Sequence, residues 1–312
     1  MKSAAAATAD DIIIQAESLV RSFGPVQAVR GLSLQIRRGE LYGLIGPDGA
    51  GKTTAIRMIA GLIVPDSGRA LVLGADSLRG GLSVREHMGL MPQQYSLYGD
   101  LSIAENLNFF GKLFCLPRKL FEERSQRLLK ITRLDRFTDR RADALSGGMY
   151  KKLALACALL HEPSVLLLDE PTNGVDPVSR RELWELLYEF VGEGMAVLVS
   201  TPYMDEAERC HRVGLINRGV LLDEGRPQEL VRSFPHEAFE IEGGDRERIH
   251  ELLERLPEVL AASPAGTRLR VVLEQGTSQR VAADFARVGA SLKPTEPDFE
   301  DMFLVRISRE TA

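Results

Sequence analysis

The sequence predicts a chain of two parts, in which a large α/β domain with a parallel sheet precedes a small α+β domain. The chain has 312 residues, and a domain usually holds about 100–200 residues. Continuous apolar strands alternate with helical segments over residues 12–232, which is typical of a parallel sheet covered on both faces. After a junction at 233–236, short strands and helices follow in the order βαββαβ, which favours a ferredoxin-like domain over residues 237–312.

In the first domain, strands open and close the segment and helices fill its middle. Residues 1–11 are rich in alanine and are expected to form a flexible tail. Helices are expected at about 103–160 and at about 180–190. The expected strands are residues 12–14, 32–36, 41–45, 165–168 and 196–199.

In the second domain, helix signals alternate with short strands. Asp245 is a candidate N-cap for a helix whose apolar residues recur at the i, i+3, i+4, i+7 spacing of one helix face. Thr277 or Ser278 is expected to begin the next helix. The expected strands are residues 238–242, 259–262, 269–273 and 290–293, and a last helix is expected at 298–307.

Composition excludes several classes of protein. Lys and Arg number 39 and Asp and Glu number 44, a net charge of −5, so no nucleic-acid partner is expected. Cys115, Cys157 and Cys210 lie far apart without a CxxC motif, which argues against a disulfide framework or a zinc site and favours a reducing cytosol. We expect all three to be small buried apolar side chains. No apolar run approaches the roughly 18–20 residues that span a bilayer, so any membrane role is expected to come through a partner.

The most specific motif is a phosphate-binding loop. Residues 46–53 read Gly-Pro-Asp-Gly-Ala-Gly-Lys-Thr, which fits G-x-x-x-x-G-K-[ST] between an apolar strand and a helical stretch. Its glycines let backbone N–H groups point at phosphate oxygens, and the helix N-terminus adds partial positive charge. Lys52 is expected to reach the β- and γ-phosphates and Thr53 to bind Mg²⁺. The expected nucleotide-binding residues here are Gly46, Pro47, Asp48, Gly49, Ala50, Gly51, Lys52, Thr53 and Thr54. Alone, the loop does not separate kinases, GTPases and motor ATPases.

Two more motifs narrow the choice. The apolar strand 165–168 leads into Asp169, placed to hold Mg²⁺ through its water shell, and Glu170, a candidate general base that polarises the attacking water. Upstream, Leu-Ser-Gly-Gly-Met at 145–149 opens a helical run, so that Ser146, Gly147 and Gly148 form a second anion cradle. A second cradle makes sense if it serves a nucleotide held by another subunit.

This set of motifs resembles the ATP-binding cassette family, the nucleotide-binding subunits of ABC transporters. The resemblance covers residues from about 12 to 231 and implies a P-loop NTPase fold with a helical subdomain at about 95–160. It implies ATP and Mg²⁺ as ligands, because in that family each ATP lies between one phosphate loop and the signature of an opposite cassette. The implied partners are a second cassette, identical or different, and an integral-membrane permease subunit. The implied location is cytoplasmic, on the inner face of the cell membrane.

Further positions match by motif. Phe23 resembles the aromatic residue that stacks on adenine; the alternative is an edge-strand core residue. Gln93 resembles the Q-loop glutamine, which contacts Mg²⁺ and the attacking water, although Gln94 lies beside it. Asp176 resembles the D-loop residue at the dimer interface; the alternative is a plain Gly/Pro turn. Residues 237–312 resemble an accessory domain of certain exporter cassettes, for which we expect a structural or regulatory dimer contact.

The sequence departs from the family at Pro202, where a histidine that hydrogen-bonds the γ-phosphate is common. Proline offers no side-chain donor, and His211 is not expected to reach back. Loss of one oriented donor typically lowers a rate by about 10²–10³-fold, so we expect ATP binding to persist and hydrolysis to be slow. The alternative is that Gln93 and Glu170 suffice.

Three functions stay open. The first is an ATPase subunit that energises a membrane exporter of the ABC-2 type. The second is a hydrolysis-weak regulatory cassette paired with an active one. The third is a soluble ABC ATPase acting on ribosomes or DNA, which usually carries two cassettes or a long coiled-coil insert. The apolar stripe Phe109, Phe110, Leu113 and Phe114 is expected to be mostly core, with some members lining a docking groove.

Overall fold

A computed structural model describes residues 11–94, 97–266 and 268–311, and the chain divides into two compact units. The first unit ends at Asp223 and the second begins at Glu224. The second unit therefore includes α8 (Pro227–Arg232), which packs on α11 (Phe299–Thr311). Of the tail expected at 1–11, only Asp11 is described, and residues 95 and 96 of the expected helical subdomain also lie outside the described residues.

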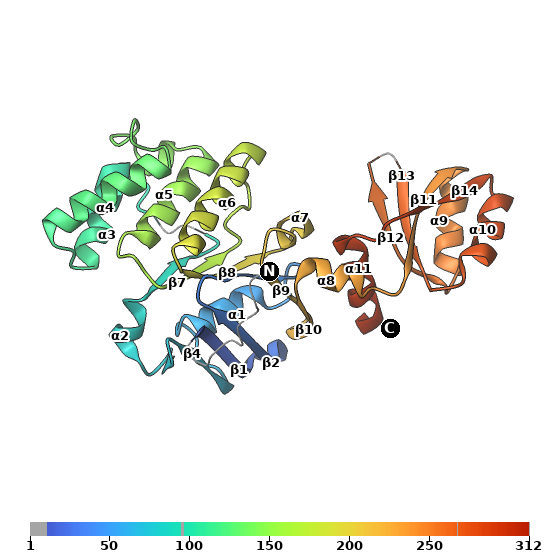
Figure 1. Ribbon diagram of the computed structural model, residues 1–312, viewed down its shortest axis with the longest axis horizontal. Helices are drawn as coiled ribbons and strands as arrows, with labels where there is room; N and C mark the ends of the chain where they lie inside the picture. The colour runs from blue at the N-terminus through green and yellow to red at the C-terminus, as the bar shows by residue number, and fades with distance from the viewer. Residues whose placement is uncertain (1–10, 95–96, 267, 312) are drawn as a thin grey trace, which may run out of the picture. The chain divides into compact units, whose positions relative to one another are not determined.

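Two sheets form the first unit, with α1 (Lys52–Ile59) between them (Figure 1). The antiparallel sheet has the order β2-β1-β4-β5. Its strands are β1 (Ile12–Phe23), β2 (Val26–Arg37), β4 (Ser67–Val72) and β5 (Ala75–Asp76). The strands expected at 12–14 and 32–36 are parts of β1 and β2, which pair along most of their length as one long hairpin.

The second sheet of this unit has the order β10-β9-β3-β8-β7-β6. Its strands are β3 (Leu41–Ile45), β6 (Met88–Met91), β7 (Val165–Asp169), β8 (Ala196–Thr201), β9 (Arg212–Asn217) and β10 (Val220–Gly225). Neighbours from β9 to β6 pair in parallel. Every residue of β3, β7 and β8 is buried, because helices or the other sheet cover both faces. The predicted parallel sheet is confirmed.

The long helices α3 to α6 gather on the side of the parallel sheet away from α1, where α5 packs against α3, α4 and α6 (Figure 1). They are α3 (Ile103–Leu113), α4 (Arg118–Ile131), α5 (Gly147–Leu159) and α6 (Pro177–Gly192); α2 (Gly81–Arg85) and α7 (Met204–Ala207) are short. A capping box between Ser102 and Glu105 begins α3. No helix in the described ranges is both long enough and apolar enough to span a membrane.

One expectation about buried side chains is wrong, and a second holds for two of its three residues. None of the stripe residues of α3 is fully buried; its buried face consists of Ile103, Asn106, Leu107 and Gly111. Cys157 and Cys210 are buried, but Cys115 is exposed because it lies in the turn after α3, with a positive φ of 53°.

The second unit is a four-stranded antiparallel sheet covered by two helices. Its order β12-β13-β11-β14 places the first and third strands in the centre, as in a ferredoxin-like fold. The strands are β11 (Glu237–Gly243), β12 (Val259–Ala265), β13 (Arg268–Leu273) and β14 (Ala290–Thr295), and the helices are α9 (Arg246–Arg255) and α10 (Ser278–Arg287). Asp245 caps α9 as expected, accepting hydrogen bonds from two backbone N–H groups. The predicted fold class of this part is confirmed.

A buried ion pair joins α11 to the sheet of the second unit. The guanidinium of Arg270 on β13 donates to both carboxylate oxygens of Asp301, with Nε 2.8 Å from each. The side chain of Asp301 is 2% exposed and that of Arg270 is 13% exposed. Removing one partner of such a pair leaves an uncompensated buried charge.

We therefore expect Asp301→Ala to destabilise the second unit by about 3 kcal/mol. Hydrogen exchange of the β13 and α11 amides in the full chain measures this effect. Glu240→Ala is the matched control, because it breaks the exposed Glu240–Arg268 pair on the same sheet and should change exchange little. Equal protection in Asp301→Ala and in the unaltered chain would contradict the expectation.

Candidate functional site

The loop between β3 and α1 borders a hollow of about 640 Å³. Gly51 has a φ of 106°, and a Cβ at this position would overlap the carbonyl oxygen of Ala28 on β2. Only glycine therefore lets the loop close against β2. Among the predicted site residues, those that line the hollow are Asp48, Gly49, Ala50, Gly51, Lys52, Thr53, Thr54, Gln93 and Glu170.

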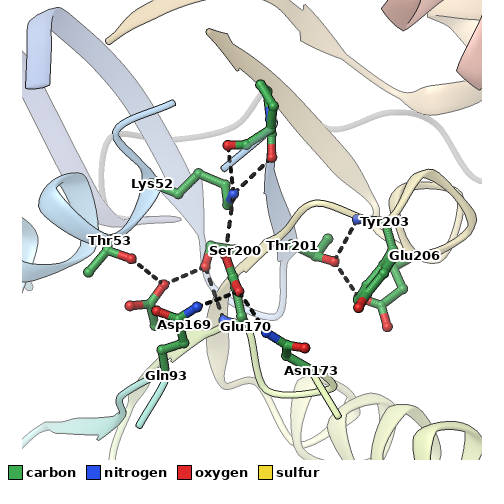
Figure 2. Close-up of polar contacts among 12 residues, drawn as sticks. Lys52, Thr53, Gln93, Asp169, Glu170, Asn173, Ser200, Thr201, Tyr203 and Glu206 are labelled. Atoms are coloured by element: carbon green, nitrogen blue, oxygen red, sulfur yellow. Dashed lines mark hydrogen bonds and ion pairs between the residues drawn. The ribbon is translucent and has the colours of Figure 1, made fainter. Parts of the chain in front are cut away.

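The buried ammonium group of Lys52 lies at the centre of the site (Figure 2). Its Nζ donates to the carbonyl oxygens of Gly46 at 2.8 Å and Pro47 at 3.0 Å. It also lies 3.3 Å from Oε1 of Glu170. A buried cation needs partners of this kind, and the loop and the carboxylate after β7 supply them.

Asp169 binds two hydroxyl groups from neighbouring elements (Figure 2). Thr53 Oγ1 donates to its Oδ1 at 3.1 Å and Ser200 Oγ donates at 2.7 Å. The carboxyl ends of β3, β7 and β8 meet here because these strands are parallel neighbours. The oxygen atoms of Thr53, Asp169 and the Gln93 amide are the donor type that Mg²⁺ prefers, so the predicted metal residues fit that ion.

Glu170 is buried and held by two amides. Its Oε2 accepts from Nε2 of Gln93 at 2.7 Å and from Nδ2 of Asn173 at 3.3 Å. Its φ of 49° is unusual for a residue other than glycine, and such strain often marks functional sites. Gln94 is exposed, so of the two adjacent glutamines Gln93 is the one that faces the carboxylate.

A second polar cluster holds the segment that contains Pro202. Thr201 Oγ1 donates to Oε2 of the fully buried Glu206 at 2.6 Å and accepts from the N–H of Tyr203 at 3.1 Å (Figure 2). Arg180 of α6 lies 3.6 Å from Glu206 and 4.6 Å from the centre of the Tyr203 ring. This cluster fixes the chain around Pro202.

His211 lies beside the first residue of β3. Its Nδ1 accepts from the N–H of Leu41 at 3.0 Å. Leu41 begins β3, whereas the phosphate-binding loop follows its other end at Ile45. The expectation that His211 does not reach the site is therefore met.

Several predicted residues lie outside the lining of the hollow. Phe23 is 47% exposed at the end of β1, with the Arg21 guanidinium 4.9 Å from its ring, so it is not a core residue. Ser146 caps α5 and is exposed, as is Gly147. Gly148 is buried, and a Cβ there would overlap Ser179 of α6.

Asp176 also lies outside the lining and caps α6. It accepts hydrogen bonds from the N–H groups of Val178 and Ser179. Hydrogen bonds from Ser179, its hydroxyl first and then its N–H, lower the pKa of the Asp176 carboxyl. One chain therefore does not bring the signature or Asp176 to its own hollow.

Sequence reasoning missed other residues of the hollow. Arg30 on β2 and Arg218 in the turn between β9 and β10 line it, together with Pro25, Val26, Gln27 and Ala28. The N–H of Arg30 donates to the carbonyl oxygen of Gly219 at 2.7 Å, which joins these two segments. No short motif contains both arginines. A positive φ of 45° at Arg218 is visible only in the structure.

Comparison with known proteins identifies the family. A family model described as ABC transporter matches residues 29–173. The probable multidrug ABC transporter ATP-binding protein YbhF of Escherichia coli K12 is 42% identical over 301 residues, which are 95% of this chain and 52% of YbhF. The Nod factor export ATP-binding protein I of Rhizobium sp. strain N33 is 35% identical over 301 residues, 96% of this chain and 98% of that protein. This chain belongs to the ABC transporter family of ATP-binding proteins. It spans about half the length of YbhF.

Solved structures of ABC proteins share the fold. An ATP binding subunit of an ABC transporter has a TM-score of 0.66 at 29% identity, covering 71% of this chain and 93% of that one. CbiO1 from Clostridium perfringens, part of the ABC transporter complex cbiONQ, has a TM-score of 0.66 at 29% identity and covers 79% and 96% of the two chains. These likenesses confirm the predicted P-loop NTPase cassette.

The close approach of the loop to β2 is testable with two glycines. Gly51 and Gly49 both have positive φ, but only a Cβ at Gly51 meets backbone, whereas a Cβ at Gly49 meets open space. We expect Gly51→Ala to destabilise the first unit by about 1–3 kcal/mol more than Gly49→Ala, the cost of overpacking. Urea unfolding without nucleotide measures the difference. Equal destabilisation by the two substitutions would show that the contact with β2 is unimportant.

Proposed function

We propose that this chain is the ATP-binding and ATP-hydrolysing subunit of an ABC exporter. The main observation in support is that Lys52, Asp169 and Glu170 lie together near the carboxyl ends of β3 and β7, beside the hollow. The relatives named for multidrug and Nod factor export favour export over a soluble ATPase that acts on ribosomes or DNA. They also favour a transport subunit over a purely regulatory cassette.

Phosphate binding requires an exchange of contacts at Lys52. Its ammonium group has three protons and three oxygen partners: two loop carbonyls and Glu170. A phosphate oxygen that contacts Lys52 must therefore compete with at least one of them. If the phosphate takes the place of Glu170, the carboxylate is freed to act on water. Binding of the triphosphate and release of the base are then one event.

Hydrolysis follows from the position of Glu170. The carboxylate accepts a proton from a water molecule as the water oxygen attacks the γ-phosphorus and the bond to the bridging oxygen breaks, which yields ADP and phosphate. Gln93 and Asn173 keep the carboxylate oriented through Oε2. Thr53, Asp169 and Gln93 would hold Mg²⁺, which neutralises phosphate charge.

A second cassette completes the proposed site. Ser146 and Gly147 are exposed at the N-terminus of α5 and lie outside the hollow of their own chain. A helix N-terminus with exposed N–H groups attracts anions. We propose that these residues and Asp176 face the nucleotide held by a partner cassette, identical or different, and that Phe23 contacts the adenine of its own nucleotide.

A groove beside the helices is the proposed contact with the membrane subunit. It has a volume of about 270 Å³ and is mostly apolar. Its lining includes Leu62, Arg85, Met88, Leu90, Phe110, Phe114, Cys157 and His161. Burial lowers the pKa of His161 to about 4, so the groove gains no charge from this side chain at neutral pH. We propose that a helix of the permease docks here and holds the chain at the inner face of the cell membrane.

Residues 237–312 are proposed to act as an accessory domain. Their ferredoxin-like core is filled by apolar side chains such as Phe239, Val271 and Phe285. The face of the sheet opposite this core carries charged pairs, for example Glu240 with Arg268 and Arg270 with Asp301 of α11. We propose a structural or regulatory contact between subunits for this domain and no chemical step.

The role of Glu170 as base is tested by Glu170→Gln. The amide keeps the size of the side chain but cannot accept the proton, so we expect turnover to fall by about 10²-fold or more while ATP affinity is kept. Steady-state phosphate release and equilibrium ATP binding measure both. Glu185→Gln, an exposed position on α6, is the control. Unchanged turnover in Glu170→Gln would remove Glu170 from the chemistry.

The effect of Pro202 is tested by supplying the missing donor. We expect Pro202→His to raise steady-state ATP turnover, by up to about 10²-fold, because an oriented donor to the γ-phosphate is restored. Pro202→Ala is the matched control, since it removes proline without adding a donor. A gain of the same size in both variants, or in neither, would count against a rate limit set at this position.

A further inference from the structure

We propose that Lys151 is a positioning residue for ATP hydrolysis, which links the N-terminal turns of α5 to Glu170 through Gln93. The inference rests on the proposed function of Glu170 and goes beyond it, because no motif assigns a role to Lys151. Lys151 is not one of the described residues that line the nucleotide hollow. Lys151 therefore acts on the reaction from outside the hollow, through the residues that it holds.

The first contact is with the backbone of Gln93. Lys151 lies just over one turn into α5, and its Nζ donates to the carbonyl oxygen of Gln93 at 3.1 Å. The neighbouring Tyr150 binds the same stretch of chain, since its hydroxyl accepts from the N–H of Leu97 at 3.2 Å. Two consecutive residues of α5 thus fix the backbone at Gln93 and at Leu97.

The second contact joins the side chain of Gln93 to the carboxylate of Glu170. Gln93 Nε2 donates to Oε2 of Glu170 at 2.7 Å, and Glu170 Oε1 lies 3.3 Å from Nζ of Lys52. Fixing the carbonyl of Gln93 limits the positions that its side chain can take. Lys151, Gln93, Glu170 and Lys52 therefore form a continuous chain of contacts from α5 to the phosphate-binding loop.

The charges of Asp169 and Glu170 affect the Lys151 ammonium group. Burial lowers the pKa of Lys151, while the charges of Asp169 and Glu170 oppose that shift. The adjacent Lys152 has a different partner, since its ammonium group pairs with the carboxylate of Glu182 on α6. Only Lys151 of these two lysines serves the site.

Lys151 lies on the helix whose N-terminus is proposed to meet a partner cassette. Ser146 caps α5, and the exposed N-terminus of this helix is the surface proposed to meet the nucleotide of a partner cassette. A shift of α5 on that contact moves Lys151 and, with it, the backbone at Gln93. Glu170 of one site then responds to the nucleotide of the other.

The experiment compares Lys151→Met, Lys151→Arg and the exposed control Lys119→Met in the full chain. Steady-state ATP hydrolysis, equilibrium ATP binding and thermal unfolding are measured for each. We expect Lys151→Met to lower kcat by about 10–100-fold, as loss of an outer-shell partner does, with KM, ATP affinity and melting temperature close to those of the unaltered chain. Lys151→Arg should restore most of kcat, because it keeps a cationic donor, and Lys119→Met should change nothing.

Two results overturn the proposal. One is an unchanged kcat in Lys151→Met, and the other is an equal loss in Lys151→Met and Lys151→Arg together with a lower melting temperature, which marks a structural role alone. Glu170→Gln is measured in parallel. If it abolishes turnover while Lys151→Met does not, only the positioning role fails; if neither substitution affects turnover, the proposed function of Glu170 fails as well.

Discussion

The buried contact between the Lys52 ammonium and its three oxygen partners is the constraint on which the site depends. A buried charge is tolerated only when it is paired, so the loop must fold back to present its own carbonyls and β7 must end beside it. The same loop lies against β2 at Gly51, leads into α1 between the two sheets and brings Lys52 next to Glu170. The phosphate-binding loop, the parallel sheet and α1 are therefore joined around this ammonium group.

The parallel sheet turns that contact into a reaction site. Because β8 pairs in parallel with both β3 and β7, the carboxyl ends of these strands meet at one edge, where Ser200 donates to Asp169 and Thr201 donates to Glu206. Gln93 follows β6 in the chain, and its side-chain amide donates a hydrogen bond to Glu170. The signature takes no part in this network within its own chain. This agrees with the proposal that the residues of the hollow hold the phosphates of one nucleotide, whereas the signature contacts the nucleotide of a partner cassette.

Sequence alone predicts the parts of the fold whose residues are constrained locally. The phosphate-binding loop, the apolar strands β3 and β7 and the Asp245 cap have spacings or residue types that few other structures tolerate, and the structure has them at the expected positions. The full lengths of β1 and β2 were not predictable, because half-exposed strands carry a weak pattern and are held by pairing with each other. The stripe on α3 misled for a related reason: an apolar face is buried only if another element covers it.

The missed site residues share a second cause. Arg30 and Arg218 come from two separate segments and meet at the hollow only through the packing of β2 against the turn after β9. No spacing along the chain encodes that meeting. Pro202 is the opposite case, since the departure is plain in the sequence, yet the network of Thr201, Glu206 and Arg180 that holds this segment appears only in three dimensions.

The most direct test of the account is the equilibrium affinity for ATP of Lys52→Ala beside that of the unaltered chain, measured by calorimetry with Mg²⁺ present. The β- and γ-phosphates are proposed to contact this ammonium group, and hydrogen bonds to a charged group contribute about 1.5–3 kcal/mol. The dissociation constant for ATP should therefore rise at least about tenfold, while that for AMP should change little. An unaltered affinity for ATP in a folded Lys52→Ala chain would contradict the central claim.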